Sequence, residues 1–188
     1  LTTLEILSQK KEGLTGVTSG FIDLDRMTSG WQKSDFIILA ARPAMGKTAF
    51  ALNLATHVAM TQDKSVAVFN LEMSAEQLAM RMLSSQGQID GYKFRNGKLE
   101  HNDWKRVNEA ISRLSDTKIF IDDTAGQTVG EIRSKCRRLA SSDEGLGLVV
   151  IDYLQLITSS TNYGGNRQQE VSDISRSLKT MALELNVP

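Results

Sequence analysis

The stretch "DFIILAARPAMGKTAFALNLA" (residues 35–55) joins a short apolar run to a helical pattern through the letters GKT. Phosphate-binding loops of the form G-x-x-x-x-G-K-[ST] lie between a strand and a helix, and their backbone N–H groups bind the phosphates of a nucleotide. Gly46, Lys47 and Thr48 occupy the last three positions of that form, while Ala41 stands where the first glycine is usual. The stretch therefore indicates either a nucleotide site with one letter changed or a chance GKT at the start of an ordinary helix.

The strand and the helix that a phosphate loop requires are both in register here. Residues 35–41 are predicted to form a buried strand, and residues 48–62 have the length and apolar spacing of a helix. Pro43 has no N–H to donate, so the phosphate donors are expected after it. Lys47 would reach the β and γ phosphates of ATP, and the Thr48 hydroxyl would hold Mg²⁺. The complete predicted cradle consists of Ala44, Met45, Gly46, Lys47, Thr48 and Ala49.

Strand and helix patterns alternate along the rest of the chain. Four apolar runs are typical of parallel strands covered on both faces, and they comprise residues 35–41, 65–71, 118–123 and 146–156. Helices are predicted for residues 48–62, 74–86, 102–114, 128–140 and 168–188, and two of them begin with a capping-box spacing, Ser74 with Gln77 and Thr128 with Glu131. The pattern predicts an α/β fold of three layers with a mostly parallel sheet and right-handed crossovers.

Two carboxylates follow predicted strands at positions that nucleotide chemistry needs. Asp152 ends the apolar run of residues 148–151, and Glu72 comes directly after residues 65–71. The carboxyl ends of parallel strands meet at one edge of a sheet, so both carboxylates should lie beside the phosphate loop. Asp152 is expected to organise Mg²⁺, and Glu72 to act as the base for the attacking water. The alternatives are a turn residue at a strand end for Asp152 and an acid favouring the dipole of the next helix for Glu72.

The composition describes a folded protein whose charge gives no evidence for a nucleic-acid partner. The chain has 188 residues, 40% of them hydrophobic, and its 22 basic side chains balance 22 acidic ones. A nucleic-acid surface must therefore be local. The one cysteine, Cys136, excludes a disulfide within the chain and fits a reducing compartment. No apolar run reaches the ~20 residues that span a bilayer, so we expect a cytoplasmic protein with no membrane partner.

Two basic segments are candidates for contact with DNA. Residues 159–167 form a glycine-bearing loop in which Asn166, Arg167 and backbone N–H groups could bind phosphate, although no aromatic stacking array accompanies them. Residues 133–138 carry three arginines and one lysine, but such a run is more often a solvated helix face. The aspartates at 122–123 end the third predicted strand and are expected to be structural, capping the turn that follows.

Five separated blocks of the sequence occur in the order found in one known family. They are "GWQKSDFIILAARPAMGKTAFALNLA", "VAVFNLEMSAEQLAMRML", "FIDDTAG", "LVVIDYLQLI" and "NRQQEVSDISRSLKTMALELNVP", and they extend over nearly the whole chain. With these blocks the chain resembles the ATPase domain of bacterial DnaB-type replicative helicases. In that family the loop reads A-R-P-x-x-G-K-T, so the resemblance makes Ala41 the usual residue at its position.

The resemblance implies a RecA-like fold, a homohexameric ring, and ATP-driven 5′ to 3′ movement along single-stranded DNA that unwinds duplex at the replication fork. It implies ATP and Mg²⁺ as cofactors, and a primase and a helicase loader as partners. It carries over Lys47 and Thr48 as the nucleotide and metal residues, Glu72 as the catalytic glutamate, Asp152 as the Walker B aspartate and Gln155 as a candidate sensor.

Residues 1–30 resemble the end of a linker that docks on a neighbouring subunit, and residues 31–188 resemble an ATPase core. In the family this core continues with a sensor strand, DNA-binding loops and an arginine finger that acts across the subunit interface. The sensor strand of RecA-like sheets lies between the phosphate-loop strand and the Asp152 strand. A chain that ended at Pro188 would lack that interior strand, and without an arginine finger, worth roughly 10³–10⁵ in rate, it is expected to hydrolyse ATP only weakly.

Two other functions remain open at this point. One is a recombinase or clock-type RecA relative, against which the blocks "ARPAMGKT" and "DYLQL" favour the helicase. The other is a nucleotide-responsive interaction module that binds ring neighbours, a loader or a primase without turnover. Hydrolysis that depends on Lys47 and is stimulated by single-stranded DNA would distinguish the motor from such a module.

Overall fold

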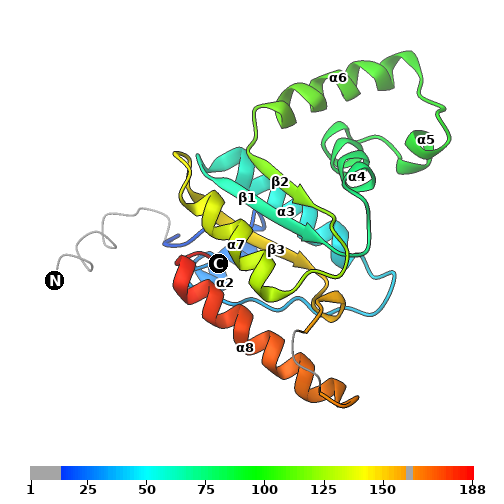
Figure 1. Cartoon of the computed structure of the whole chain (residues 1–188). Coiled ribbons are helices and arrows are strands. Elements are labelled where there is room, and N and C mark those ends of the chain that lie inside the picture. The colour runs from blue at the N-terminus through cyan, green and yellow to red at the C-terminus, as the bar shows by residue number, and fades with distance from the viewer. Residues whose placement is uncertain (1–13, 160–162) are drawn as a thin grey trace.

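A parallel three-stranded sheet forms the centre of the computed structural model, which describes residues 14–159 and 163–188 (Figure 1). The middle strand is β1 (Ser65–Asn70), with β2 (Ile119–Asp122) on one side and β3 (Leu146–Asp152) on the other. Every residue of β1 is buried, because the strand has a neighbour on each edge and helices on each face. The predicted parallel sheet is confirmed.

Helices cover both faces of the sheet and give the molecule three layers (Figure 1). They are α3 (Lys47–Thr61) and α4 (Ala75–Gly87) on one face and α7 (Val129–Ala140) and α8 (Arg167–Leu185) on the other. A first hydrophobic core, between the sheet and helices α3 and α4, contains the fully buried side chains of Val58 and Leu78. A second core, between the sheet and helices α7 and α8, contains Ile132. Burial in the second core raises the pKa of the Cys136 thiol to about 12, so this thiol stays protonated and unreactive near neutral pH. The predicted three-layer α/β architecture is confirmed.

Helix caps and a short turn set the ends of several elements. Both predicted capping boxes are confirmed, since the Ser74 hydroxyl accepts from the Gln77 N–H at the start of α4, and Thr128 and Glu131 form the same pair at the start of α7. The fourth predicted strand ends at Asp152, earlier than expected, because the apolar residues beyond it form a 3-10 turn that packs against α8. The remaining elements are α2 (Ile22–Thr28), α5 (Gly91–Arg95), α6 (His101–Ser115) and the 3-10 turn η1 (Leu154–Leu156).

The prediction of a strand at residues 35–41 is wrong, because this segment forms no ladder with the sheet. A groove of about 1250 Å³ lies between the segment and β3, and residues of both line it. Strands pair only when their backbones lie about 4.8 Å apart, so a segment on the far side of a groove has no partner. On the β3 side, the Val149 N–H donates to the Pro188 carbonyl at 3.0 Å. Residues 35–41 therefore line a groove instead of extending the sheet.

The described part of the N-terminal lead-in packs onto α3. Val17 and Trp31 form an antiparallel bridge, and Trp31 is buried in the core that α3 shares with the sheet. The Asp25 carboxylate accepts hydrogen bonds from the Ser19 hydroxyl at 2.6 Å and from the Thr18 hydroxyl at 2.6 Å. Burial alone would raise the pKa of Asp25, but these hydrogen bonds outweigh it and lower the pKa. The Thr18 hydroxyl also lies 3.5 Å from His57 Nε2 on α3, so the lead-in contacts this helix through polar as well as apolar groups.

A buried carboxylate joins α5 to α6 and makes the fold sensitive to acid. The Asp103 side chain is 3% exposed, and it pairs with Lys93 Nζ at 2.8 Å and with Arg106 Nη2 at 2.7 Å. Hydrogen bonds from Lys93, from the Glu100 N–H and from Arg106 hold the pKa of Asp103 well below its usual range. Because the pKa is lower in the folded state, the carboxylate stabilises the fold above the unfolded-chain pKa of 3.8. That stability is lost as the pH falls through the folded-state pKa.

Replacing Asp103 with Asn is therefore expected to lower the urea midpoint of unfolding at pH 7. The difference from the unchanged protein should narrow below about pH 4, because the unfolded chain then binds a proton at this carboxyl while the folded state does not, and the wild-type protein loses stability. Urea denaturation followed by circular dichroism between about pH 7 and 2.5 measures both effects. Asp116→Asn, at the exposed C-cap of α6, serves as the control. If the urea midpoints of Asp103→Asn and the wild-type protein differed by the same amount from about pH 7 to 2.5, the stabilising role of the Asp103 carboxylate would be contradicted.

Candidate nucleotide-binding site

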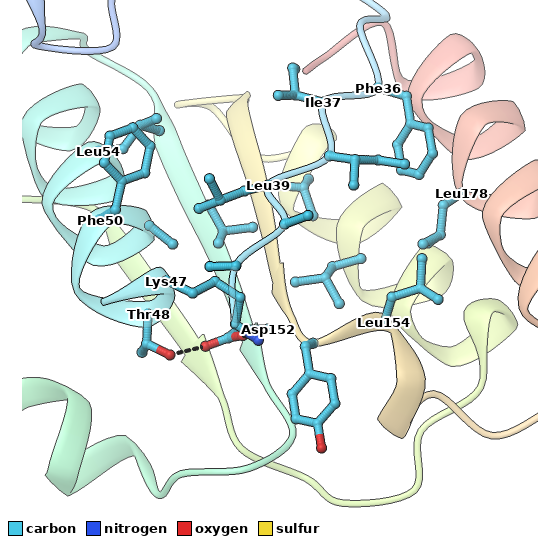
Figure 2. Close-up of a pocket in the computed structure, with 18 of the residues that line it drawn as sticks. Phe36, Ile37, Leu39, Lys47, Thr48, Phe50, Leu54, Asp152, Leu154 and Leu178 are labelled. Carbon is cyan, nitrogen blue, oxygen red and sulfur yellow. Dashed lines mark hydrogen bonds and ion pairs between the residues drawn. The ribbon is translucent and has the colours of Figure 1, made fainter. Parts of the chain in front are cut away.

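Lys47 and Thr48, the first two residues of α3, are directed toward Asp152 at the end of β3 (Figure 2). The Lys47 ammonium lies 2.8 Å from Asp152 Oδ1, and the Thr48 hydroxyl donates to Asp152 Oδ2 at 2.5 Å. The Asp152 side chain is only 6% exposed, and a carboxylate so deeply buried needs both a countercharge and hydrogen bonds. The fold thus brings together Thr48 and Asp152, which are 104 positions apart in the sequence.

The loop that enters α3 offers a row of backbone donors. The Phe50 N–H donates to the Gly46 carbonyl at 2.9 Å, whereas the N–H groups of residues 46–49 have no backbone acceptor in the described part of the chain. First-turn N–H groups of this kind form an anion site at the start of a helix. Met45, also predicted for the cradle, differs because its N–H donates to the Arg42 carbonyl at 3.3 Å. The donors available to a phosphate therefore lie mainly at the helix start.

Positive backbone φ angles shape this loop. Gly46, the N-cap of α3, has a φ of 86°, which glycine adopts without steric cost. Space is not the reason for glycine there, because a Cβ at Gly46 would meet no atom within 4 Å. Ala44 has a φ of 63° although it carries a Cβ, so the loop holds a strained conformation at its centre. Ala41 is not among the residues with positive φ, which explains why alanine is acceptable at that position.

Glu72 follows β1 by two residues and lines the same pocket as Asp152. Its side chain is exposed, and the carboxylate has no hydrogen-bond or ion-pair partner among the residues that the structure describes. Helix α4 begins only at Ala75, and its first-turn acid is Glu76 rather than Glu72. The alternative role of Glu72 as an acid of the helix dipole therefore has no support in the geometry.

Two residues that the sequence patterns did not single out lie against the predicted ones. Lys47 Nζ is 4.2 Å from the centre of the Tyr153 ring, a cation–π contact. Asn70, the last residue of β1, donates from its side-chain amide to Asp152 Oδ2 at 3.3 Å. Neither residue type indicates nucleotide chemistry by itself. Their positions at strand ends, beside Glu72 and Asp152, were the available signal.

The predicted sensor and DNA-contacting residues lie in one cluster where α8 begins. Gln155 lines the pocket, and its backbone carbonyl accepts a hydrogen bond from the Arg167 guanidinium at 2.5 Å. Arg167 also pairs with Glu170 at 2.6 Å. Asn166 is the N-cap of α8 and accepts from the Gln169 N–H at 3.2 Å. Arg167 therefore belongs to the first turn of α8 rather than to the predicted loop, and both predicted side chains already have partners within the chain.

The basic run on α7 is largely paired within the chain. Lys135 Nζ lies 2.5 Å from Asp122 Oδ2 at the end of β2, and Arg137 pairs with Glu184 on α8. Burial alone would raise the pKa of Asp122, but hydrogen bonds from Lys135 and Thr124 lower it. These pairs support the structural role expected for Asp122 and leave less positive charge on α7 for DNA.

The oxygen atoms around Asp152 fit Mg²⁺. This ion prefers oxygen ligands, and in nucleotide sites it is held by one or two protein oxygens together with phosphates and water. Thr48 Oγ1 and Asp152 Oδ2 form such a pair, 2.5 Å apart. Within residues 14–159 and 163–188, no group of three His, Cys, Asp or Glu side chains could hold a metal ion by itself. Phosphate oxygens and water would supply the other ligands of a magnesium ion held by these two oxygens. Over the same residues, none of the helices is both long enough and apolar enough to cross a bilayer.

Residues 16–188 match the family described as DnaB-like helicase C terminal domain. The chain is also 55% identical over 185 residues to the replicative DNA helicase DnaC of Bacillus subtilis (strain 168), an alignment that covers 98% of this chain and 40% of the relative. The chain thus spans about 40% of the length of this curated relative. The similarity establishes a family and leaves the activity of the whole protein to be proposed.

Two solved structures share the fold over nearly the whole chain. The first is described as an ATPase domain, and it superposes with a TM-score of 0.92 at 39% identity, covering 99% of this chain and 66% of that one. The second is a DnaB-like replicative helicase, described together with its interactions with primase; it gives a TM-score of 0.90 at 39% identity and covers 99% of this chain and 45% of that one. These similarities confirm the predicted RecA-like ATPase fold and favour the helicase over the recombinase alternative.

Proposed function

The chain belongs to the DnaB-like helicase C-terminal domain family, and we propose that it is the ATP-hydrolysing motor domain of a hexameric replicative DNA helicase. In this proposal residues 31–188 are the RecA-like ATPase core and residues 1–30 lead into it, of which residues 1–13 lie outside the described part. The helicase would move 5′ to 3′ on single-stranded DNA at the replication fork, in the cytoplasm. A helicase loader and a primase are the proposed partners. The primase is supported by a structurally similar DnaB-like helicase that is described together with its interactions with primase.

The observation that carries the proposal is the meeting of Lys47, Thr48 and Asp152 in a pocket that Glu72 also lines. Phosphoryl transfer from a nucleotide requires mainly positioning and the stabilisation of negative charge. The ammonium of Lys47 and the backbone N–H groups at the start of α3 supply positive potential to one side of the pocket. Asp152 and Glu72 supply acceptors to the other side.

For a nucleotide to bind, the Lys47–Asp152 ion pair would first have to open. Phosphate oxygens would compete with Asp152 for the Lys47 ammonium, because a triphosphate carries more negative charge than one carboxylate. Asp152 and the Thr48 hydroxyl are then the residues that would hold Mg²⁺, which when bound neutralises charge on the transferring phosphoryl group. The exposed Glu72 carboxylate would accept a proton from the attacking water, whose oxygen forms the new bond to the γ phosphorus. The bond between the γ phosphorus and the β–γ bridging oxygen would break in the same step, and ADP would leave with the electron pair.

Asn166 and Arg167 remain the proposed contacts to single-stranded DNA. Both side chains have partners in the structure, so DNA would have to compete for them. A DNA phosphate would take the place of the Glu170 carboxylate beside Arg167, which is half-exposed and within reach of solvent. Binding of this kind would be sensitive to salt, because each neutralised phosphate releases counterions.

We expect single-stranded DNA to stimulate ATP hydrolysis by the full-length protein several-fold, because a motor couples hydrolysis to movement on its track. Steady-state hydrolysis with and without an oligo(dT) measures this, and blunt duplex serves as the control. Forked duplexes with one free tail should unwind only when that tail is 5′. Nucleotide binding without stimulated turnover would instead support the interaction module, and unwinding from a 3′ tail alone would contradict the proposed direction.

A further inference from the structure

Asn70 is a buried polar residue of the candidate site for which the proposed function so far has no role. It is the last residue of the central strand β1, its exposure is 1%, and it stands opposite Asp152 in the β1–β3 register. A side-chain amide in such a place must satisfy its donors and acceptor within the protein. The hydrogen-bond partners of the Asn70 amide therefore indicate the role of this residue.

The Asn70 amide connects the Asp152 carboxylate to the backbone that carries Glu72. Its nitrogen donates to Asp152 Oδ2 at 3.3 Å. Its oxygen accepts from the backbone N–H groups of Glu72 at 3.1 Å and Met73 at 2.7 Å. The orientation of the amide follows from these contacts, because the flipped amide would place an N–H₂ group against two N–H donors and an oxygen against a carboxylate.

These contacts fix the backbone of Glu72, whose own side chain has no partner in the described part of the chain. The Asp152 oxygen that Asn70 contacts is also the one that accepts from the Thr48 hydroxyl. A single side chain thus links the metal-organising carboxylate to the turn that carries the base. A displacement of about 1 Å at a reacting group can cost roughly 100-fold in rate, so such a link affects turnover more than binding.

We propose that Asn70 is a positioning residue, which holds the Glu72 base at a set distance from Asp152. This inference rests on the proposed ATP hydrolysis. Asn70 itself would touch neither the nucleotide nor the attacking water, and it would act on the reaction only through Glu72 and Asp152.

The test is a double-mutant cycle between Asn70→Ala and Glu72→Gln in the full-length protein, with kcat and KM for Mg-ATP as the readout. Asn70→Ala is expected to lower kcat by roughly 10- to 100-fold, with KM changed by less than about threefold. In the Glu72→Gln background the same substitution should lower the remaining single-turnover rate by less than about twofold, because residues that act as a unit are not additive. Asn70→Ser, which keeps a small polar side chain, provides the same cycle if the alanine variant does not fold.

Gln127 offers a matched control for the loss of a buried amide. It is 3% exposed, and its amide also contacts a strand-end aspartate, donating to Asp122 Oδ1 at 3.0 Å while accepting from Lys135 Nζ at 2.7 Å. Gln127→Ala should lower the melting temperature but leave kcat within about twofold. The proposal is overturned if Asn70→Ala leaves kcat within about twofold, or if its full effect is repeated in the Glu72→Gln background. A wild-type protein without ATPase activity would instead refute the proposed function.

Discussion

Replacing Lys47 with Ala should abolish measurable ATP hydrolysis and weaken the binding of Mg-ATP by roughly 10- to 150-fold. A hydrogen bond to a charged group contributes about 1.5–3 kcal/mol, which corresponds to that range of Kd. The loss in turnover should be larger than the loss in binding, because negative charge on the phosphoryl oxygens must be stabilised in the transition state. Fluorescence titration with a nucleotide analogue and steady-state hydrolysis measure the two effects separately.

The same substitution also changes the protein before any nucleotide binds. Lys47 neutralises the Asp152 carboxylate, whose side chain is 6% exposed. Removing one partner of a buried ion pair can cost about 3–5 kcal/mol. The cost here should be smaller, because the Lys47 side chain is 27% exposed and Asp152 keeps two other hydrogen bonds. The melting temperature of the variant must therefore be measured together with its binding.

Lys135 provides the matched control for Lys47. It also pairs with an aspartate at a strand end, Nζ to Asp122 Oδ2 at 2.5 Å, and its side-chain exposure of 31% is close to that of Lys47. Lys135→Ala should lower stability while leaving nucleotide binding within about twofold. Mg-ATP binding that survives Lys47→Ala at wild-type strength would remove the basis for the phosphate-loop assignment.

Local sequence patterns predicted those helices and strands whose ends depend on residues close together in the sequence. The capping boxes at Ser74 and Thr128 placed the starts of α4 and α7, because a cap is a contact between residues three positions apart. The continuous apolar runs placed β1 and β3, although the fourth run was predicted to continue past Asp152, because strands buried on both faces are mainly apolar. These parts of the fold depend on short-range chemistry that a single sequence contains.

The segment at residues 35–41 shows the limit of that reasoning. Its letters are as apolar as those of β1, yet a strand also needs a paired neighbour, and the groove beside β3 leaves the segment without one. The apolar composition of a segment indicates how deeply it should be buried. It does not indicate which strand the segment pairs with. A prediction of pairing requires knowledge of strand order, which local patterns do not contain.

The candidate site was predictable where residue type and strand position both pointed to it. Lys47, Thr48, Asp152 and Glu72 have charged or hydroxyl side chains that follow a recognisable loop or strand. For Asn70 the position at a strand end was the available signal, and its residue type did not support it, because an asparagine at a strand end more often belongs to a turn. Its contact with Asp152 becomes visible only when the register of β1 and β3 is known.

Replacing Glu72 with Gln is expected to lower kcat for ATP hydrolysis by about 10²–10⁴-fold, the range for the loss of a general base. The amide has the same shape as the carboxylate but does not take a proton from water. Binding of Mg-ATP should stay within about threefold, because the Glu72 side chain is exposed and has no hydrogen-bond or ion-pair partner among the described residues. Single-turnover hydrolysis at saturating protein isolates the chemical step from binding and release.

Glu76 tests whether the effect belongs to Glu72 or to any acid near the start of α4. It lies in the first turn of that helix, is exposed, and does not line the pocket. Glu76→Gln should leave kcat within about twofold, since it removes only a favourable interaction with the helix dipole of about 0.3–1 kcal/mol. If both variants lost activity equally, the acidic charge near α4 would matter more than a base, and the role of Glu72 would have to be given up. A loss confined to Glu72→Gln would assign the proton transfer to the carboxylate that β1 carries into the pocket.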